Sequence, residues 1–215
     1  AILTARRNKN KISQNELLES IEKVSLGPER KSHLLSEDEK KLTAYHEAGH
    51  ALVASVVPHA DPVHKVSIIS RCRAAGYTMT IPKEDKKMQR RSEFLAELAV
   101  MLGGHAAEKN IFGEVSTGAH NDLKRATNLA RRMITDYGMS ETIPPRTFGD
   151  RCDMIFLGRE LHEQRDYSEK VAERIDEEIA SMIAKALETA ITVINKHKPK
   201  LDAIVKVLLE KETIE

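Results

Sequence analysis

Two histidines and a glutamate lie close together in the segment His46-Glu47-Ala48-Gly49-His50, which has the spacing H-E-x-x-H. On a helix, positions i and i+4 share one face, so His46 and His50 can offer two imidazoles to a single metal ion. Glu47 follows the first histidine and can reach a water molecule bound to that ion. Two histidine ligands with a glutamate general base are the arrangement of a zinc protease.

The residues around this motif predict a buried helix over residues 37–57 that ends near Pro58. Apolar residues and Gly49 recur there at helical spacing: Leu42, Tyr45, Gly49, Leu52, Val53 and Val56. Two histidines and a glutamate on a buried helix need polar partners, which favours a site over a chance five-residue match. Gly49 costs the helix about 1 kcal/mol relative to alanine and therefore indicates a close approach of another backbone or of the metal site.

A zinc site of this kind needs a third protein ligand and leaves one position open for water. Six candidates follow the motif in the sequence: His105, Glu108, Glu114, His120, Asp122 and Asp136. Asp122 has the best local argument, because a glycine-containing loop over residues 116–121 leads directly into a predicted helix there. The same position also suits a helix cap without a metal role, and His120 is the direct competitor. Spacing alone therefore leaves the third ligand open.

Composition places the chain among helix-rich soluble domains. Its 215 residues, 40% hydrophobic and 31% charged with no tryptophan, suit one large domain or two small ones. The formal net charge of +1 gives no electrostatic case for nucleic acid as a partner. Cys72 and Cys152 share no pairing motif and are interpreted as ordinary thiols in a reducing compartment. No apolar run reaches membrane-spanning length, and the N-terminus lacks a signal-peptide pattern.

The chain divides into three parts: residues 1–32, 33–150 and 151–215. The first part carries a predicted helix capped by Ser13 with Glu16 three residues on, and the run from Gly27 to Lys31 ends it. Such a short piece cannot bury a core alone, so we interpret it as the end of a preceding domain.

The second part carries the chemistry. Besides the motif helix, we expect a β-hairpin from residues 65–70 and 76–81, and helices over residues 92–107 and 122–137. Gly103-Gly104 in the first of these helices would permit close packing against the motif helix, and Gly138 would stop the second.

The third part predicts a long helix over residues 168–196 and a shorter one that starts at Pro199. The overall expectation is a mainly α fold: a helical zinc-metalloprotease domain with a small β-hairpin or sheet and a C-terminal helical bundle.

Eight segments of the chain resemble the FtsH family of membrane-anchored AAA+ zinc proteases, and they occur in the family's order. They are Tyr45–Leu52, Gly76–Thr78, Leu102–Glu108, Ser116–Leu123, Arg125–Ala130 followed by Tyr137–Ser140, Phe156–Arg159 and Ile175–Glu178. The resemblance covers nearly the whole chain and rests on many separate motifs.

This resemblance implies a set of roles for individual residues. It implies His46, His50 and Asp122 as the ligands of one Zn²⁺ per chain and Glu47 as the catalytic base. It also implies that residues 1–32 are the end of an ATPase module, that the protease domains form a six-membered ring, and that ATP-driven pulling feeds unfolded membrane and soluble proteins into that ring. Family members sit in a bacterial inner membrane with the protease domain on the cytoplasmic side, or in the equivalent organelle membrane.

The chain departs from the full family pattern in lacking a G-x-x-x-x-G-K-[ST] phosphate loop and a membrane span. ATP and Mg²⁺ are therefore expected only in an ATPase module outside these residues, as is the membrane anchor. The region Pro144–Asp153 matches the family poorly and is interpreted as a variable loop.

We expect the substrate to be an unfolded polypeptide that pairs, as an added β-strand, with the edge strand formed by Tyr77, Thr78, Met79 and Thr80. A simple cover over the motif helix is the alternative role for this hairpin.

A different class of function is a catalytically silent, zinc-stabilised helical scaffold or oligomerisation module for an AAA+ ATPase. The presence of Glu47 favours the enzyme over this scaffold. A purely structural zinc site is less favoured, because neither cysteine is near the motif and no fourth ligand is evident.

Overall fold

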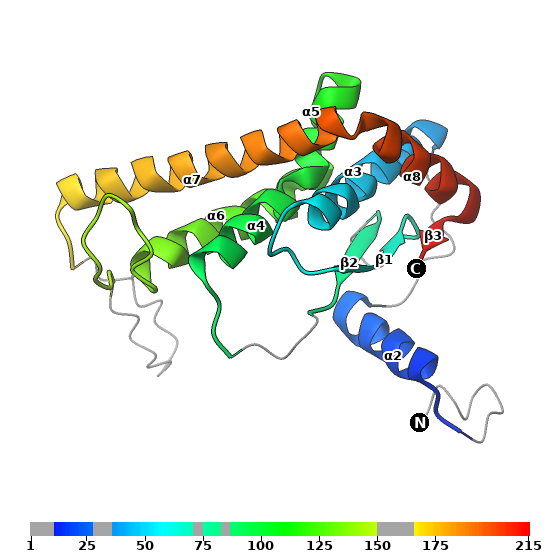
Figure 1. Cartoon of the computed structure of the whole chain (residues 1–215), viewed down its shortest axis with the longest axis horizontal. Helices are drawn as coiled ribbons and strands as arrows, with labels where there is room; N and C mark the ends of the chain where they lie inside the picture. Colours follow the sequence, from blue (N-terminus) through cyan, green and yellow to red (C-terminus); the bar gives the residue numbers. More distant parts are fainter. Residues whose placement is uncertain (1–10, 28–35, 71–74, 83–86, 150–165) are drawn as a thin grey trace, which may run out of the picture.

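The computed structural model describes residues 11–27, 36–70, 75–82, 87–149 and 166–215, and it confirms the predicted mainly α fold with one small sheet. Figure 1 shows the elements. The helices are α2 (Gln14–Leu26), α3 (Glu37–Val56), α4 (Arg91–Met101), α5 (Gly103–Phe112), α6 (His120–Thr135), α7 (Glu169–Lys196) and α8 (Lys198–Lys211), with a 3₁₀ turn η1 (Thr117–Ala119). The strands are β1 (Val63–Ser67), β2 (Tyr77–Thr80) and β3 (Thr213–Ile214). Cys72, Cys152 and part of the region 144–153 lie outside the described residues.

The motif helix α3 is the centre of the fold. It begins at a capping box in which the Glu39 backbone N–H donates to Ser36 Oγ and the Ser36 N–H donates to the Glu39 carboxylate. From Thr43 to Ala54 nearly every residue is buried. Helices α4, α5, α7 and α8 and the sheet all pack against α3, so this helix is surrounded by protein along the motif.

Helices α3 and α5 approach each other closely because both carry glycine at the contact. A Cβ added to Gly49 would lie 2.5 Å from the Gly103 carbonyl oxygen, and one added to Gly103 would lie 2.8 Å from the Gly49 carbonyl oxygen. The close approach inferred from Gly49 is therefore confirmed, and its partner is the backbone of the second glycine-bearing helix.

The helix predicted over residues 92–107 is two helices, so that prediction was wrong in detail. Helix α4 ends at Met101, Leu102 has φ −89° and ψ −1°, and α5 starts at Gly103. The chain turns at this point because Gly103 and Gly104 must reach the backbone and side chains of α3, which a straight continuation of α4 would not allow. The break gives α4 and α5 separate contacts with the motif helix.

The sheet has the order β2-β1-β3, with both pairs antiparallel. The predicted hairpin is present as β1 and β2, whose register pairs Val66 with Thr78 and Ser67 with Tyr77. Strand β3 was not predicted; its two residues pair with Val66 and Ser67 and cover the second side of β1. Among the described strands, β2 therefore forms one edge of the sheet and lies next to the motif helix.

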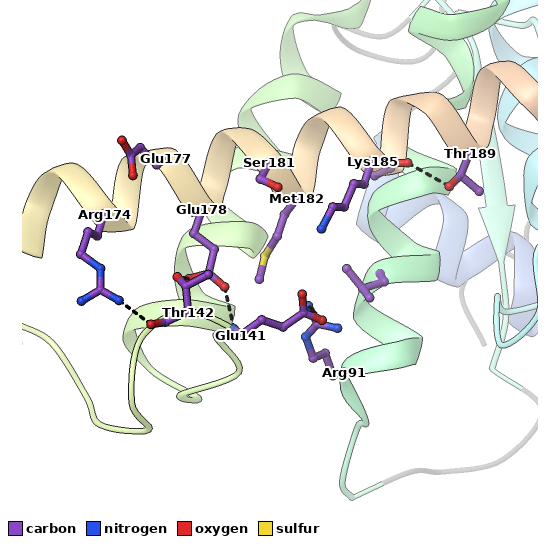
Figure 2. Close-up of a pocket in the computed structure, with 12 residues that line it drawn as sticks. Arg91, Glu141, Thr142, Arg174, Glu177, Glu178, Ser181, Met182, Lys185 and Thr189 are labelled. Carbon is purple, nitrogen blue, oxygen red and sulfur yellow. Dashed lines mark hydrogen bonds and ion pairs between the residues drawn. The ribbon is translucent and has the colours of Figure 1, made fainter.

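Helix α7 runs the length of the bundle and packs on α4, α5 and α6 (Figure 1). Its Glu178 carboxylate holds the loop that follows α6, accepting hydrogen bonds from the Ser140 hydroxyl, the Glu141 N–H and the Thr142 hydroxyl. Figure 2 shows Glu178 beside Glu141 and Thr142 of this loop. A cavity of about 460 Å³ lies between α4, α7 and this loop. Within the described part of the chain, no helix is both long enough and apolar enough to cross a bilayer.

The glycine contact predicts the effect of a single methyl group. Gly49→Ala would place a Cβ 2.5 Å from the Gly103 carbonyl oxygen, so α3 and α5 must separate, and we expect stability to fall by about 1–3 kcal/mol. Thermal or urea unfolding of the metal-free chain measures this. The control is Lys41→Ala, an exposed site on the same helix, which should stay within about 0.5 kcal/mol of the parent. An unchanged midpoint in Gly49→Ala would show that the helices can move apart freely.

Candidate metal centre

Three potential ligands from two helices meet at one point. His46 and His50 come from α3 and Asp122 comes from the first turn of α6. One ligand atom from each lies within 4.8 Å of the others. Both histidines are buried, with 9% and 8% of their surface exposed, while Asp122 is half-buried at the edge of a cleft.

The spacing of these atoms fits a tetrahedral metal. His46 Nε2 lies 3.1 Å from His50 Nε2 and 3.2 Å from Asp122 Oδ2, and His50 Nε2 lies 3.3 Å from the same oxygen. Ligand atoms on a tetrahedron with zinc bonds of about 2.0–2.1 Å are about 3.3–3.4 Å apart. Two imidazoles and one carboxylate, with the cleft on the remaining side, are also the ligand set of a catalytic rather than a structural zinc site.

His46 is oriented by α5. Its Nδ1 lies 2.7 Å from Glu108 Oε1, which fixes the ring so that Nε2 faces the other two ligands. The Glu108 carboxylate is almost fully buried and is itself held by the backbone N–H and hydroxyl of Ser116. Gly104 makes room for the ring, because a Cβ there would lie 2.5 Å from His46 Cε1. Glu108 therefore contacts the far nitrogen of His46 and lies outside the group of three candidate ligands.

His50 is oriented by α4. Its Nδ1 donates to the Val100 carbonyl oxygen at 2.7 Å, in the last turn of that helix, and again Nε2 faces the site. The partner of His50 is a backbone carbonyl, so the type of side chain at position 100 does not reveal the contact. No pattern in the sequence could have identified this partner.

Glu47 lies beside the three ligands and is buried, with 6% of its surface exposed. The Thr78 hydroxyl of β2 lies 2.8 Å from Glu47 Oε2 and 3.1 Å from the Glu47 carbonyl oxygen, so it holds the carboxylate against the strand. Gly76 permits this approach, since a Cβ there would lie 2.9 Å from Glu47 Cγ. Sequence reasoning placed Thr78 on a substrate strand but missed its contact with the proposed base.

Charge distribution supports these roles. Burial acts against a charge on His46, but the hydrogen bonds with Asp122 and Glu108 and the nearby Glu47 outweigh it and raise the pKa of His46 to about 10. Burial likewise opposes a charge on Asp122, yet hydrogen bonds from His46 and His50 hold its pKa well below the usual value. Without a metal, two carboxylates therefore stabilise a proton on His46, and a cation bound at this point would take over that role.

Burial raises the pKa of Glu47, and the charges of His50 and His46 and the Thr78 hydrogen bond only partly oppose this. A carboxylate with a raised pKa is a better proton acceptor near neutral pH.

A cleft of about 1330 Å³ opens onto these residues, bounded by α3, β2, α4 and α6. Of the four residues predicted to bind substrate, Tyr77, Thr78 and Thr80 line the cleft and Met79 does not. The cleft runs from the three ligand atoms along β2 and is large enough for a polypeptide segment.

The remaining candidate ligands lie outside the group of three. His120 is exposed on the cleft wall at the start of α6, and Glu114 is exposed on the loop after α5. Asp136 pairs with Arg132 at 3.6 Å at the far end of α6. His105 lies on α5, with a buried Nδ1 for which no partner is present among the described residues. The structure therefore brings Asp122, and not His120, within reach of the two histidines, the alternative that spacing had left open.

A helix-borne H-E-x-x-H motif with a carboxylate as third donor and an open cleft defines the class of zinc-dependent metallohydrolases. Comparison with known proteins narrows the class. The family model described as Peptidase family M41 matches residues 33–215, and the chain belongs to this family.

Named relatives agree with this assignment. The chain is 56% identical to "ATP-dependent zinc metalloprotease FtsH 1" of Sphaerobacter thermophilus and 54% identical to the protein of the same name from Thermomicrobium roseum, over 100% of its own length and 33% of theirs. It is 48% identical to "ATP-dependent zinc metalloprotease FtsH" of Thermotoga maritima, again over 100% of its own length and 35% of that protein. The chain thus spans about a third of the length of these relatives.

The contact between Glu108 and His46 predicts a change in metal affinity. Glu108→Gln keeps the size of the side chain but removes the charge that orients His46 and raises its basicity, so we expect zinc affinity to fall roughly 10- to 100-fold. Competition with a chromophoric zinc chelator measures the affinity. Glu114→Gln, an exposed glutamate outside the cleft, is the control and should bind zinc as the parent does. Equal affinities in the two variants would remove Glu108 from the metal centre.

Proposed function

We propose that this chain is a zinc-dependent endopeptidase in which His46, His50 and Asp122 hold Zn²⁺ and Glu47 is the catalytic base. The observation that carries the proposal is the convergence of three ligand atoms within 4.8 Å of one another, next to a buried glutamate at the wall of an open cleft. Membership of peptidase family M41 supports the same reading.

The reaction follows from the placement of these groups. Zn²⁺, when bound, lowers the pKa of its water and polarises the scissile carbonyl as a Lewis acid. Glu47 accepts the proton of the attacking water and then passes it to the leaving amine, which its raised pKa favours. Thr78 keeps the carboxylate of Glu47 aimed along the strand while the proton moves. Glu108 and the Val100 carbonyl hold the two imidazoles in place throughout.

Strand β2 supplies a binding edge for an extended polypeptide. Ile81 N–H donates to the Pro62 carbonyl oxygen at 3.1 Å, toward β1. Backbone groups alternate sides along a strand, so the N–H of Thr80 points to the opposite, open side beside the cleft. A substrate that pairs there uses main-chain hydrogen bonds, which suits cleavage of unfolded chains of varied sequence.

The other properties inferred for the whole protein rest on its relatives. Their names describe ATP-dependent enzymes, and these relatives are about three times as long as this chain. We propose that residues 1–32 end an ATPase module, residues 33–150 form the protease core and residues 151–215 complete it with a helical bundle. Leu17, Ile21 and Val24 on α2 are exposed at helical spacing, which supports packing of this face against an upstream module. We further propose that the whole protein forms a homohexameric ring and that ATP drives the delivery of misassembled membrane and soluble proteins to it. Its anchor would lie in a bacterial inner membrane, with the protease domain on the cytoplasmic side, or in the equivalent organelle membrane.

Glu47→Gln tests the catalytic assignment. The isosteric amide cannot accept the proton, so we expect casein hydrolysis to fall by at least about 100-fold while bound zinc stays at about one per chain. The two measurements are peptide release and metal analysis on the same preparations. Glu37→Gln, an exposed glutamate at the start of the same helix, is the control and should cleave like the parent.

The outcome also separates the protease from the silent scaffold. The scaffold would be favoured if the parent and Glu47→Gln both bind zinc and neither of them cleaves casein. This result would have to hold for the chain and for the longer protein with its ATPase. Cleavage that survives in Glu47→Gln would assign the base to another residue.

Thr80→Pro tests the substrate edge. Proline removes the N–H that points to the open side but none that pairs with β1, so we expect KM for an unfolded peptide to rise roughly three- to tenfold. Position 78 is unsuitable, because its hydroxyl also contacts Glu47. Thr80→Val, which keeps the N–H and loses only the hydroxyl, is the matched control. Equal KM values for the two variants would assign the hairpin the role of a cover over the motif helix.

A further inference from the structure

Glu97 lines the same cleft as the three ligands, one turn of α4 before the residue that fixes His50. Residues 97 and 100 lie on one face of this helix, since they are three positions apart. A rise of about 1.5 Å per residue puts Glu97 about 4.5 Å along α4 from the residue whose carbonyl contacts His50, on the wall of the same cleft. Nothing in the proposed reaction uses Glu97.

The charge of Glu97 is incompletely compensated in this position. Burial raises the pKa of its carboxyl group, Arg125 and Arg132 oppose this from a distance, and Asp61 adds to it. Among the described residues, no donor or cation makes a hydrogen bond or ion pair with the Glu97 carboxylate. Its neighbour Glu93 differs, because that carboxylate accepts from the Arg90 N–H at the start of α4.

Arg125 lines the same cleft and has a larger effect on Glu97 than Arg132 has, but it is exposed to solvent. A half-buried carboxylate without a close partner gains most from a cation brought to it, because the desolvation cost is already present in the free protein. The cleft is where a polypeptide would bring such a cation.

We propose that Glu97 forms a subsite of the substrate cleft that selects a basic side chain, lysine or arginine, near the bond that is cut. This inference rests on the proposed peptidase function and assigns a specificity-determining residue to it. The flexible stem of a lysine can cross the apolar wall while its ammonium group reaches the carboxylate.

The sheet indicates which side of the scissile bond this subsite serves. Thr78 marks the position of Glu47, and Thr80 pairs with Val63, two residues after Asp61. Glu97 and Asp61 interact electrostatically, so the subsite lies toward the C-terminal end of β2. A substrate antiparallel to β2 would therefore place the basic residue N-terminal to the scissile bond. An extended chain advances about 3.3 Å per residue, which puts this residue about two or three positions from the bond.

Peptide binding tests the subsite without requiring turnover. Fluorescent peptides carrying lysine, norleucine or glutamate at each position around one cleavage site are titrated into the zinc-loaded Glu47→Gln chain, with anisotropy as the readout. The same peptides are cleaved by the chain with Glu47 in place. At one position we expect lysine to bind about tenfold more tightly than norleucine.

Variants of Glu97 decide whether this residue causes the preference. Glu97→Gln should remove the difference between lysine and norleucine, and Glu97→Lys should favour glutamate at the same position. Glu114→Gln, an exposed site outside the cleft, is the charge-matched control and should keep the preference for lysine. An equal ratio of lysine to norleucine in the parent and in Glu97→Gln would overturn the proposal.

The two assays separate this inference from the proposed function. Cleavage without a Glu97-dependent preference would overturn the subsite alone. Lysine-selective binding that depends on Glu97, with no cleavage by the chain, would support the subsite and count against the peptidase.

Discussion

The structure depends on the burial of three polar side chains in the middle of one helix. His46, Glu47 and His50 are almost inaccessible to solvent, and unpartnered polar groups there would cost several kcal/mol. Three of the elements that pack against α3 each supply one partner: Glu108 from α5, the Val100 carbonyl from α4 and the Thr78 hydroxyl from β2. Helix α6 adds Asp122, whose carboxylate lies next to both histidines and completes the proposed ligand set. The same packing that buries α3 therefore also supplies the hydrogen-bond partners of the motif side chains.

This packing explains the glycines as well as the partners. Glu108 reaches His46 only because α5 lies against the backbone of α3, and that distance excludes a Cβ at Gly49 and at Gly103. Gly104 is needed for the imidazole ring and Gly76 for the Glu47 side chain. Four glycines thus serve one site, in three segments that are far apart in the sequence.

Local patterns were sufficient to predict the motif helix, the hairpin and the long helix α7, because periodicity and capping act over neighbouring residues. They failed where the determinant is distant in sequence. The break at Leu102 arises from contact with α3, and β3 is a two-residue strand that exists only through pairing with β1. Asp122 and His120 could not be separated by spacing, since both are near the start of α6 and only the packing of α6 decides which of them faces the histidines.

In the proposed scheme, helix α4 serves the metal centre and the substrate subsite through different groups. Its contribution to the metal centre is the Val100 carbonyl. This is a backbone group, so any residue that does not distort the helix would supply it. Its contribution to the cleft is the side chain at position 97, one turn away on the cleft wall. A substitution at position 97 would change the charge on the cleft wall and leave the Val100 carbonyl that contacts His50 in place. The Val100 carbonyl positions His50, and the side chain at position 97 would contact the substrate. Because these are different groups of one helix, the residue type at position 97 can change without moving His50.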